Sequence, residues 1–177
     1  AERMGQVRVG SHDMDLDVGP MISATQQRRV QGFIDQALED GLPVIGKGRL
    51  AEGLPAGGFY VEPIIFGPVP LANRVASEEV FGPVLAAFPF EDEAAAIRLA
   101  NATPYGLVAG LWSRDGGKQL RVARAIRVGQ VFVNGYGAGG GIELPFGGMK
   151  HSGHGREKGF EALHEFTTLK TIVLRHG

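Results

Sequence analysis

The sequence predicts an α/β protein with an open, mostly parallel, twisted sheet flanked by helices. Between residues 84 and 133, apolar stretches of strand composition alternate with amphipathic helical stretches. This order is typical of crossover connections between parallel strands that are buried on both faces. With 177 residues, 44% of them apolar, the chain can bury a sizeable core, and disorder is excluded.

The first predicted element is a helix over about residues 24–40. Ser23 and Gln26 fit a capping box, and Ile22 is placed to act as a hydrophobic staple. Gly41 lies where a left-handed C-cap is expected. One apolar stripe at helical spacing comprises Val30, Phe33, Ile34, Ala37 and Leu38.

Short strands and two further helices are predicted next. Strands are expected at residues 44–45, 59–66, 84–90, 107–112 and 130–133, with a loop at 46–58. Pro63 cannot donate a ladder hydrogen bond, so it should lie at an edge or bulge. Asp92 and Asp115 are the expected helix caps, and Pro104 ends the first of these helices. A helix at about 156–163 and a long strand at 166–174 complete the prediction.

The composition excludes several function classes. Lys and Arg number 18 and Asp and Glu 19, so a net charge of −1 gives no bulk attraction to nucleic acid or anionic membranes. Without cysteine, the chain has no disulfide, no cysteine zinc site and no thiol nucleophile. No apolar run approaches the roughly 20 residues that cross a bilayer. We therefore expect a cytoplasmic protein with neither nucleic acid nor membrane as partner.

Two glycine-rich stretches match nucleotide-binding motifs without their structural context. Residues 41–47 match seven positions of a P-loop, but Gly48 replaces the Ser or Thr and no helix follows. Residues 135–140 match the dinucleotide fingerprint, but residues 142–148 cannot begin a helix. We interpret the first stretch as a helix cap plus strand. The second is interpreted as a flexible or ligand-hugging loop.

Two pairs of polar residues are weak candidates for a site. His151 and His154 have no further ligand nearby, so solvated loop histidines are the favoured interpretation over a metal site. Glu78 and Glu79 are adjacent and cannot face one site together on a regular element.

Three segments, taken together and in order, resemble the NAD(P)-dependent aldehyde dehydrogenases. Residues 78–84 (EEVFGPV) resemble the family's E-[IV]-F-G-P-V segment, and residues 101–107 (NATPYGL) its N-x-x-x-Y-G-L segment. Residues 145–157 (PFGGMKHSGHGRE), preceded by Val133 and Asn134, resemble its P-F-G-G-x-K-x-S-G-x-G-R-E stretch. The resemblance covers nearly the whole chain. It implies the C-terminal part of the catalytic domain at 1–165 and an oligomerisation strand at 166–177.

The resemblance implies oxidation of an aldehyde to a carboxylic acid. A cysteine thiolate attacks the aldehyde, hydride passes to the nicotinamide, and a glutamate activates water to hydrolyse the thioester. The family's cysteine, general base and coenzyme domain all precede the part matched here. We therefore expect no catalytic residue in this chain, a truncated enzyme that is inactive alone, and weak or absent binding of NAD or NADP. A separate N-terminal half is a possible partner.

Three site residues are carried over from the family. Glu79 matches the glutamate that binds the hydroxyls of the nicotinamide ribose, which suits a carboxylate that accepts two hydrogen bonds. Phe81 matches the aromatic beside that ribose, and Phe146 an aromatic of the substrate tunnel. The loop 135–144 would line the substrate entrance. Positions expected to be structural are Asn134, Gly147, Gly148, Ser152, Gly153 and Arg156.

Two hypotheses from different classes stay open. The chain is either part of an aldehyde-oxidising enzyme or a non-catalytic module that associates with itself through residues 166–174. A long strand with unpaired backbone groups needs a partner, which is a second copy or the chain's own sheet. Part of a catalytic domain is also expected to expose an apolar face or edge.

Overall fold

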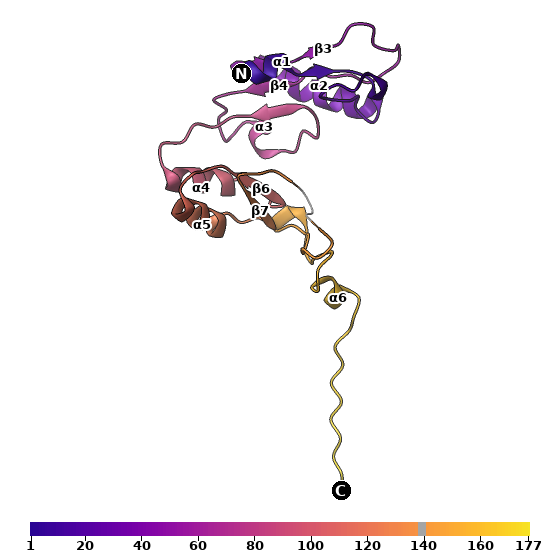
Figure 1. Ribbon diagram of the computed structural model, residues 1–177, viewed down its shortest axis with the longest axis vertical. Coiled ribbons are helices and arrows are strands. Elements are labelled where there is room, and N and C mark those ends of the chain that lie inside the picture. The colour runs from indigo at the N-terminus through magenta and orange to yellow at the C-terminus, as the bar shows by residue number, and fades with distance from the viewer. Residues whose placement is uncertain (138–140) are drawn as a thin grey trace. The chain divides into compact units, whose positions relative to one another are not determined.

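Helices and short, mostly parallel strands alternate in the computed structural model, which describes residues 1–137 and 141–177 (Figure 1). Tertiary contacts define two units, residues 1–90 and residues 91–177. Each unit contains a parallel strand pair and flanking helices, so the predicted α/β class is confirmed. The predicted division between residues 165 and 166 concerns the terminal strand and stays a prediction.

The first unit contains two small sheets. Strand β4 lies between β2, which is antiparallel to it, and β5, which is parallel to it, while β1 pairs in parallel with β3. Its elements are α1 (Glu2–Gln6), β1 (Arg8–Val9), η1 (His12–Met14), α2 (Ala24–Glu39), β2 (Val44–Lys47), β3 (Arg49–Leu50), β4 (Ile64–Phe66), α3 (Arg74–Ser77) and β5 (Val84–Ala86).

Helix α2 begins and ends where its caps were predicted. The Ser23 hydroxyl accepts a hydrogen bond from the Gln26 N–H at 3.2 Å. Gly41 has a φ of 74°, and the N–H groups of Gly41 and Leu42 donate into the last turn of the helix. These bonds form a Schellman motif. Residues 41–47 are thus a helix cap followed by strand β2, as interpreted from the sequence.

Two details of the α2 start were wrong. Ile22 is 87% exposed and is no hydrophobic staple. The residue that a staple would contact is Gln27, whose amide offers no apolar surface and donates to the Tyr60 carbonyl. The capping box is not completed, since no described bond joins the Ser23 N–H to the Gln26 side-chain oxygen; the side chain reaches to the carbonyls of Val80 and Phe81, to which its amide nitrogen donates.

Two predicted strands are shorter than expected. The strand predicted at 59–66 is limited to β4, because Pro63 has no N–H to donate to a ladder. The strand predicted at 84–90 is limited to β5, which pairs residue for residue with the three residues of β4. The loop predicted at 46–58 contains the end of β2 and the two residues of β3.

The core of the first unit is apolar and centres on α2 and β4. Phe66 and Val30 are fully buried, whereas Leu38, at the end of the predicted stripe, is 48% exposed. The buried cluster comprises Val30, Phe33, Ile34, Ala37, Leu42, Val61, Ile64, Phe66, Val69, Val75 and Val80. The other four members of the predicted stripe therefore face the core.

The second unit is built on one parallel strand pair. Strands β6 and β7 pair over four residues, with Val108 opposite Gln130, and α5 connects them. As predicted, Asp92 and Asp115 cap α4 and α5, accepting from backbone N–H groups at 2.7 and 3.0 Å. The elements are α4 (Glu93–Asn101), β6 (Val108–Leu111), α5 (Gly116–Ala125), β7 (Gln130–Val133), η2 (Lys150–Ser152) and α6 (Ala162–Glu165).

The end of the chain differs from the prediction. The helix predicted at 156–163 is wrong: Lys158 and Gly159 have positive φ angles, which a right-handed helix cannot contain, and only α6 forms. Residues 168–177 run away from α6 as an extended segment with no ladder partner in the described part of the chain (Figure 1). The segment 166–174, which was predicted to be a strand, thus does not pair with the chain's own sheet.

Candidate functional site

The segment between α3 and β5 is held by side chains of α2. Arg29 Nη2 donates a hydrogen bond to the Glu79 carbonyl at 2.7 Å. Gln26 Nε2 donates to the carbonyls of Phe81 and Val80 at 2.9 and 3.3 Å. Three consecutive carbonyl groups of an irregular segment are therefore satisfied by one helix.

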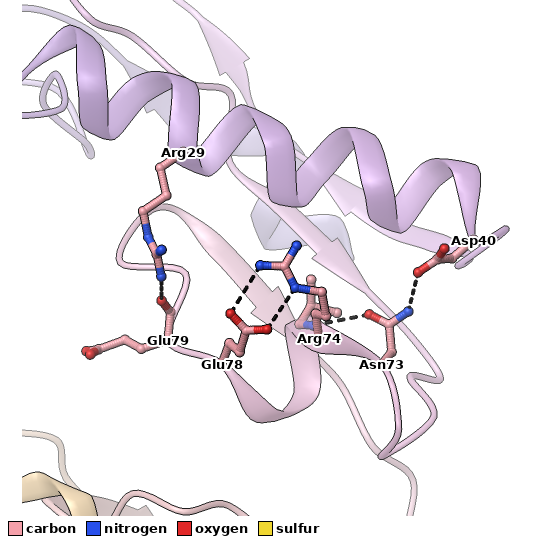
Figure 2. Close-up of polar contacts among 7 residues, drawn as sticks. Arg29, Asp40, Asn73, Arg74, Glu78 and Glu79 are labelled. Atoms are coloured by element: carbon pink, nitrogen blue, oxygen red, sulfur yellow. Dashed lines mark hydrogen bonds and ion pairs between the residues drawn. The ribbon is translucent and has the colours of Figure 1, made fainter.

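The carboxylates of Glu78 and Glu79 point in different directions (Figure 2). Glu78 forms a two-point contact with Arg74, at 2.7 and 3.1 Å, and this hydrogen bonding lowers the pKa of Glu78. Glu79 is exposed, and no described residue bonds to its carboxylate. Its two oxygens are thus available to accept hydrogen bonds from a ligand. As expected for neighbours in sequence, the two acids do not face one site.

A buried aromatic ring and two arginines support this segment. The guanidinium carbons of Arg29 and Arg74 lie 5.0 and 4.5 Å from the ring centroid of Phe33, within the range of cation–π contacts. The Asn73 amide donates to the Asp40 carboxylate at 2.7 Å and adds a second contact between α2 and α3 (Figure 2). These contacts therefore hold α2 and α3 together.

The backbone at Phe81 and Gly82 has an unusual conformation and lies close to α2. Phe81 has a φ of 58°, which is uncommon for a residue with a side chain, and its ring is 69% exposed. A Cβ at Gly82 would lie 2.5 Å from a methyl carbon of the fully buried Val30. Glycine thus lets the backbone approach α2. An exposed aromatic ring can pack on a ligand ring, and an unpaired carboxylate can accept hydrogen bonds from a diol; this segment carries one residue of each kind.

Phe146 belongs to the second unit and lines a cavity of about 620 Å³. Its backbone N–H and carbonyl both bond to Glu157 at 2.7 Å, and Lys158 Nζ lies 5.7 Å from its ring centroid. Glu79 and Phe81 lie two positions apart on one segment of the first unit.

The predicted entrance loop at 135–144 includes residues 138–140, which lie outside the described residues, as does the end of the glycine-rich stretch 135–140. The interpretation of this stretch as a loop that lines a substrate entrance stays a prediction.

The second and third motif segments contact each other. The Ser152 hydroxyl accepts from the Gly106 N–H at 3.0 Å. Lys150 Nζ donates to the carbonyls of Asn101 and Thr103, at 3.2 and 3.1 Å, where α4 ends. A cation at a helix C-terminus is favourable because the last carbonyls lack partners within the helix.

Other motif residues also make backbone-supporting contacts. Asn134 has a φ of 53°, and its side-chain oxygen accepts from the Ser113 N–H at 3.0 Å. Arg156 donates to the Gly148 carbonyl at 3.0 Å. These contacts agree with the structural roles expected from the resemblance.

A metal site and a membrane span are both missing from residues 1–137 and 141–177. No three or more His, Cys, Asp or Glu side chains gather there in a way that could hold a metal ion. No helix in those ranges has the length and apolar character needed to cross a membrane.

The α/β fold and the three motif segments agree with the dehydrogenase family that the sequence resembles. The chain belongs to the aldehyde dehydrogenase family, whose family model matches residues 1–172. It is 35% identical to a betaine aldehyde dehydrogenase of Sinorhizobium fredii, over 99% of this chain and 36% of that protein. It is 40% identical to a 2-aminomuconic semialdehyde dehydrogenase of Danio rerio, over 93% of this chain and 34% of that protein.

Solved structures that resemble this chain belong to the same family. A Burkholderia cenocepacia protein assigned to the aldehyde dehydrogenases is 57% identical, with a TM-score of 0.91, over 100% of this chain and 37% of its own. A Mycobacterium tuberculosis aldehyde dehydrogenase complexed with NAD⁺ is 38% identical, with a TM-score of 0.85, over 97% of this chain and 35% of its own. The chain thus spans about a third of the length of these relatives.

Proposed function

We propose that these residues form part of an NAD(P)-dependent aldehyde dehydrogenase, which oxidises an aldehyde to a carboxylic acid. The observation that carries the proposal is the exposed carboxylate of Glu79, to which no described residue bonds, with the exposed Phe81 two residues further along the same segment. Family membership and the NAD⁺ complex of the M. tuberculosis relative support it.

Each proposed role follows from the chemistry of the side chain. The Glu79 carboxylate accepts two hydrogen bonds from the hydroxyls of the nicotinamide ribose, and Phe81 packs beside that ribose. Together they orient the coenzyme, whose nicotinamide accepts a hydride when it is bound. Phe146 supplies an apolar wall that orients the aldehyde and excludes water.

The 177 residues contain no cysteine. The thiolate that begins the family reaction must therefore come from residues beyond these 177, whether on one polypeptide or in a separate N-terminal half. We also infer weak or absent binding of NAD or NADP by the 177 residues alone.

Glu79→Gln tests the coenzyme role. The assay uses a chimaera in which this chain replaces the matching 37% of the B. cenocepacia protein. Hydrogen bonds to a charged group contribute about 1.5–3 kcal/mol, so kcat/KM for the coenzyme should fall roughly 10- to 100-fold, with KM for the aldehyde unchanged. Formation of reduced nicotinamide is followed by ultraviolet absorbance.

Glu78→Gln is the matched control, because it makes the same chemical change one residue away in a carboxylate that faces Arg74. It should leave kcat/KM for the coenzyme within about twofold of the unchanged chimaera. An equal loss in both variants, or no loss in Glu79→Gln, contradicts the proposed role.

A second candidate function is self-association through residues 166–174. The observation that favours it is an extended segment with unpaired backbone and exposed apolar side chains, among them Leu169, Ile172 and Leu174. Such a strand stabilises itself by pairing with a strand of another copy. This role is compatible with the enzyme and is the whole function of a non-catalytic module.

Replacing both Ile172 and Leu174 by serine is expected to raise the dissociation constant of self-association at least tenfold. Burying each of these apolar side chains in the interface contributes about 1.5–3 kcal/mol to association, and a serine side chain does not make that contribution. Analytical ultracentrifugation measures the constant, with Thr168→Ser plus Thr171→Ser as the matched control. The unchanged chain sedimenting as a monomer at every concentration would disprove this proposal.

A further inference from the structure

We propose that Gln26 and Arg29 are positioning residues for the proposed coenzyme contact, acting through the backbone of Glu79 and Phe81. The inference rests on the proposed function, because the position of Glu79 and Phe81 affects catalysis only if the coenzyme binds there. Neither α2 side chain needs to touch the coenzyme for this role.

The carbonyl groups of residues 79–81 take their hydrogen bonds from side chains. A backbone carbonyl is a strong acceptor whose partner is a backbone N–H, a side chain or water. Here no backbone N–H of the described residues donates to these three carbonyls, and their bonds come from Arg29 and Gln26 alone. Without the two side chains, the segment between α3 and β5 would lose these attachments to α2.

Both donors start from the same face of one helix. The backbone N–H of Gln26 donates to the Ser23 hydroxyl at the helix cap, and the guanidinium carbon of Arg29 lies 5.0 Å from the ring centroid of the buried Phe33. Arg29 follows Gln26 by three residues, so both side chains reach from the same face of α2. A segment without regular structure is thus attached to a helix at three successive carbonyl groups.

The bonds from α2 also oppose backbone strain at Phe81. Phe81 has a left-handed φ of 58°, and a residue with a side chain keeps such a conformation only where its surroundings enforce it. Gln26 donates to the carbonyl of this same residue. Since a misplacement of about 1 Å in a catalytic geometry can cost about 100-fold in rate, loss of these bonds should affect hydride transfer.

The first measurement uses the 177-residue chain and is independent of the coenzyme. Arg29→Ala should increase fast backbone motion at residues 79–82, lowering ¹⁵N order parameters from about 0.85 toward 0.6. Arg28→Ala is the matched control, since among the described residues the Arg28 side chain has a hydrogen bond only to Thr25, on the same helix, and the substitution should change nothing at residues 79–82. Unchanged order parameters in Arg29→Ala overturn the inference.

The second measurement uses the chimaera with the B. cenocepacia protein. Arg29→Ala and Gln26→Met should each lower kcat/KM for the coenzyme roughly 10-fold, without changing KM for the aldehyde, and Arg29→Lys should restore part of the loss. A merely structural role would reduce the amount of active enzyme and leave both KM values unchanged. An equal effect of Arg28→Ala overturns the inference.

Glu79→Gln separates the two proposals. If it lowers kcat/KM for the coenzyme while Arg29→Ala and Gln26→Met do not, the positioning role is wrong and the proposed function stands. If neither Glu79→Gln nor the α2 variants have an effect, the proposed function is wrong and the positioning role falls with it.

Discussion

The 177-residue chain, purified by itself, is expected to form no detectable NADH or NADPH from any aldehyde. The family reaction begins with a thiolate that forms a covalent bond to the substrate, and the chain has no cysteine. Removal of a catalytic nucleophile lowers kcat by about 10⁶-fold in a well-studied covalent enzyme, which would place turnover below detection. The measurement is ultraviolet absorbance of reduced nicotinamide across a panel of aliphatic and aromatic aldehydes.

The chimaera with the B. cenocepacia protein is the positive control, because it holds the same 177 residues together with the rest of that relative's chain. Turnover in the chimaera and none in the chain locates the missing group outside these residues. Aldehyde-dependent turnover that co-purifies with the chain and is abolished by Glu79→Gln would contradict the prediction. So would a substrate adduct on one of its side chains, detected by mass spectrometry.

Local signals predicted where α2, α4 and α5 begin. Ser23, Asp92 and Asp115 each accept the backbone hydrogen bond expected of a helix N-cap, and Gly41 has the left-handed φ expected at a C-terminus. Capping depends on a few neighbouring residues, so the sequence contains nearly all the information needed. The α2 stripe was predictable for the same reason, since burial follows the helical period.

Strand ends and the region after residue 155 were not predictable in this way. The length of β5 is set by its partner β4, and the pairing of two segments that are 20 residues apart is not a local property. The helix expected at 156–163 had suitable composition, but positive φ angles at Lys158 and Gly159 replace it with an irregular segment. Its backbone bonds, such as Gly159 N–H to the Ile142 carbonyl, are long-range.

The candidate site was likewise predictable only in part. The motif predicted Glu79 and Phe81 as site residues, and the structure adds that the carboxylate of Glu79 has no bond to a described residue, whereas that of Glu78 is paired with Arg74. The contacts of Gln26 and Arg29 span 50 or more residues and were missed. The available signal was their i, i+3 spacing, which places both side chains on one helix face. Gln26 also fitted a capping box, and that local interpretation was preferred to a long-range contact.

Phe66→Ala is expected to lower the free energy of unfolding of the first unit by about 3–5 kcal/mol. Phe66 is fully buried, and it lies on the strand at the centre of the β2–β4–β5 sheet, within the cluster formed with α2. The substitution removes the transfer free energy of a large ring and leaves a cavity that the surrounding side chains fill only partly. Since domains are stable by only about 5–15 kcal/mol, this loss should unfold a large share of the molecules on mild heating.

Urea denaturation followed by far-ultraviolet circular dichroism measures the effect, and Phe90→Ala is the matched control. Phe90 lies in the same unit and is 63% exposed, so the same substitution should change the free energy of unfolding by less than about 1 kcal/mol. Equal losses in the two variants would mean that burial does not distinguish these rings. That result would remove the support for a core centred on β4 and, with it, for the rigid α2 on which the positioning of Glu79 depends.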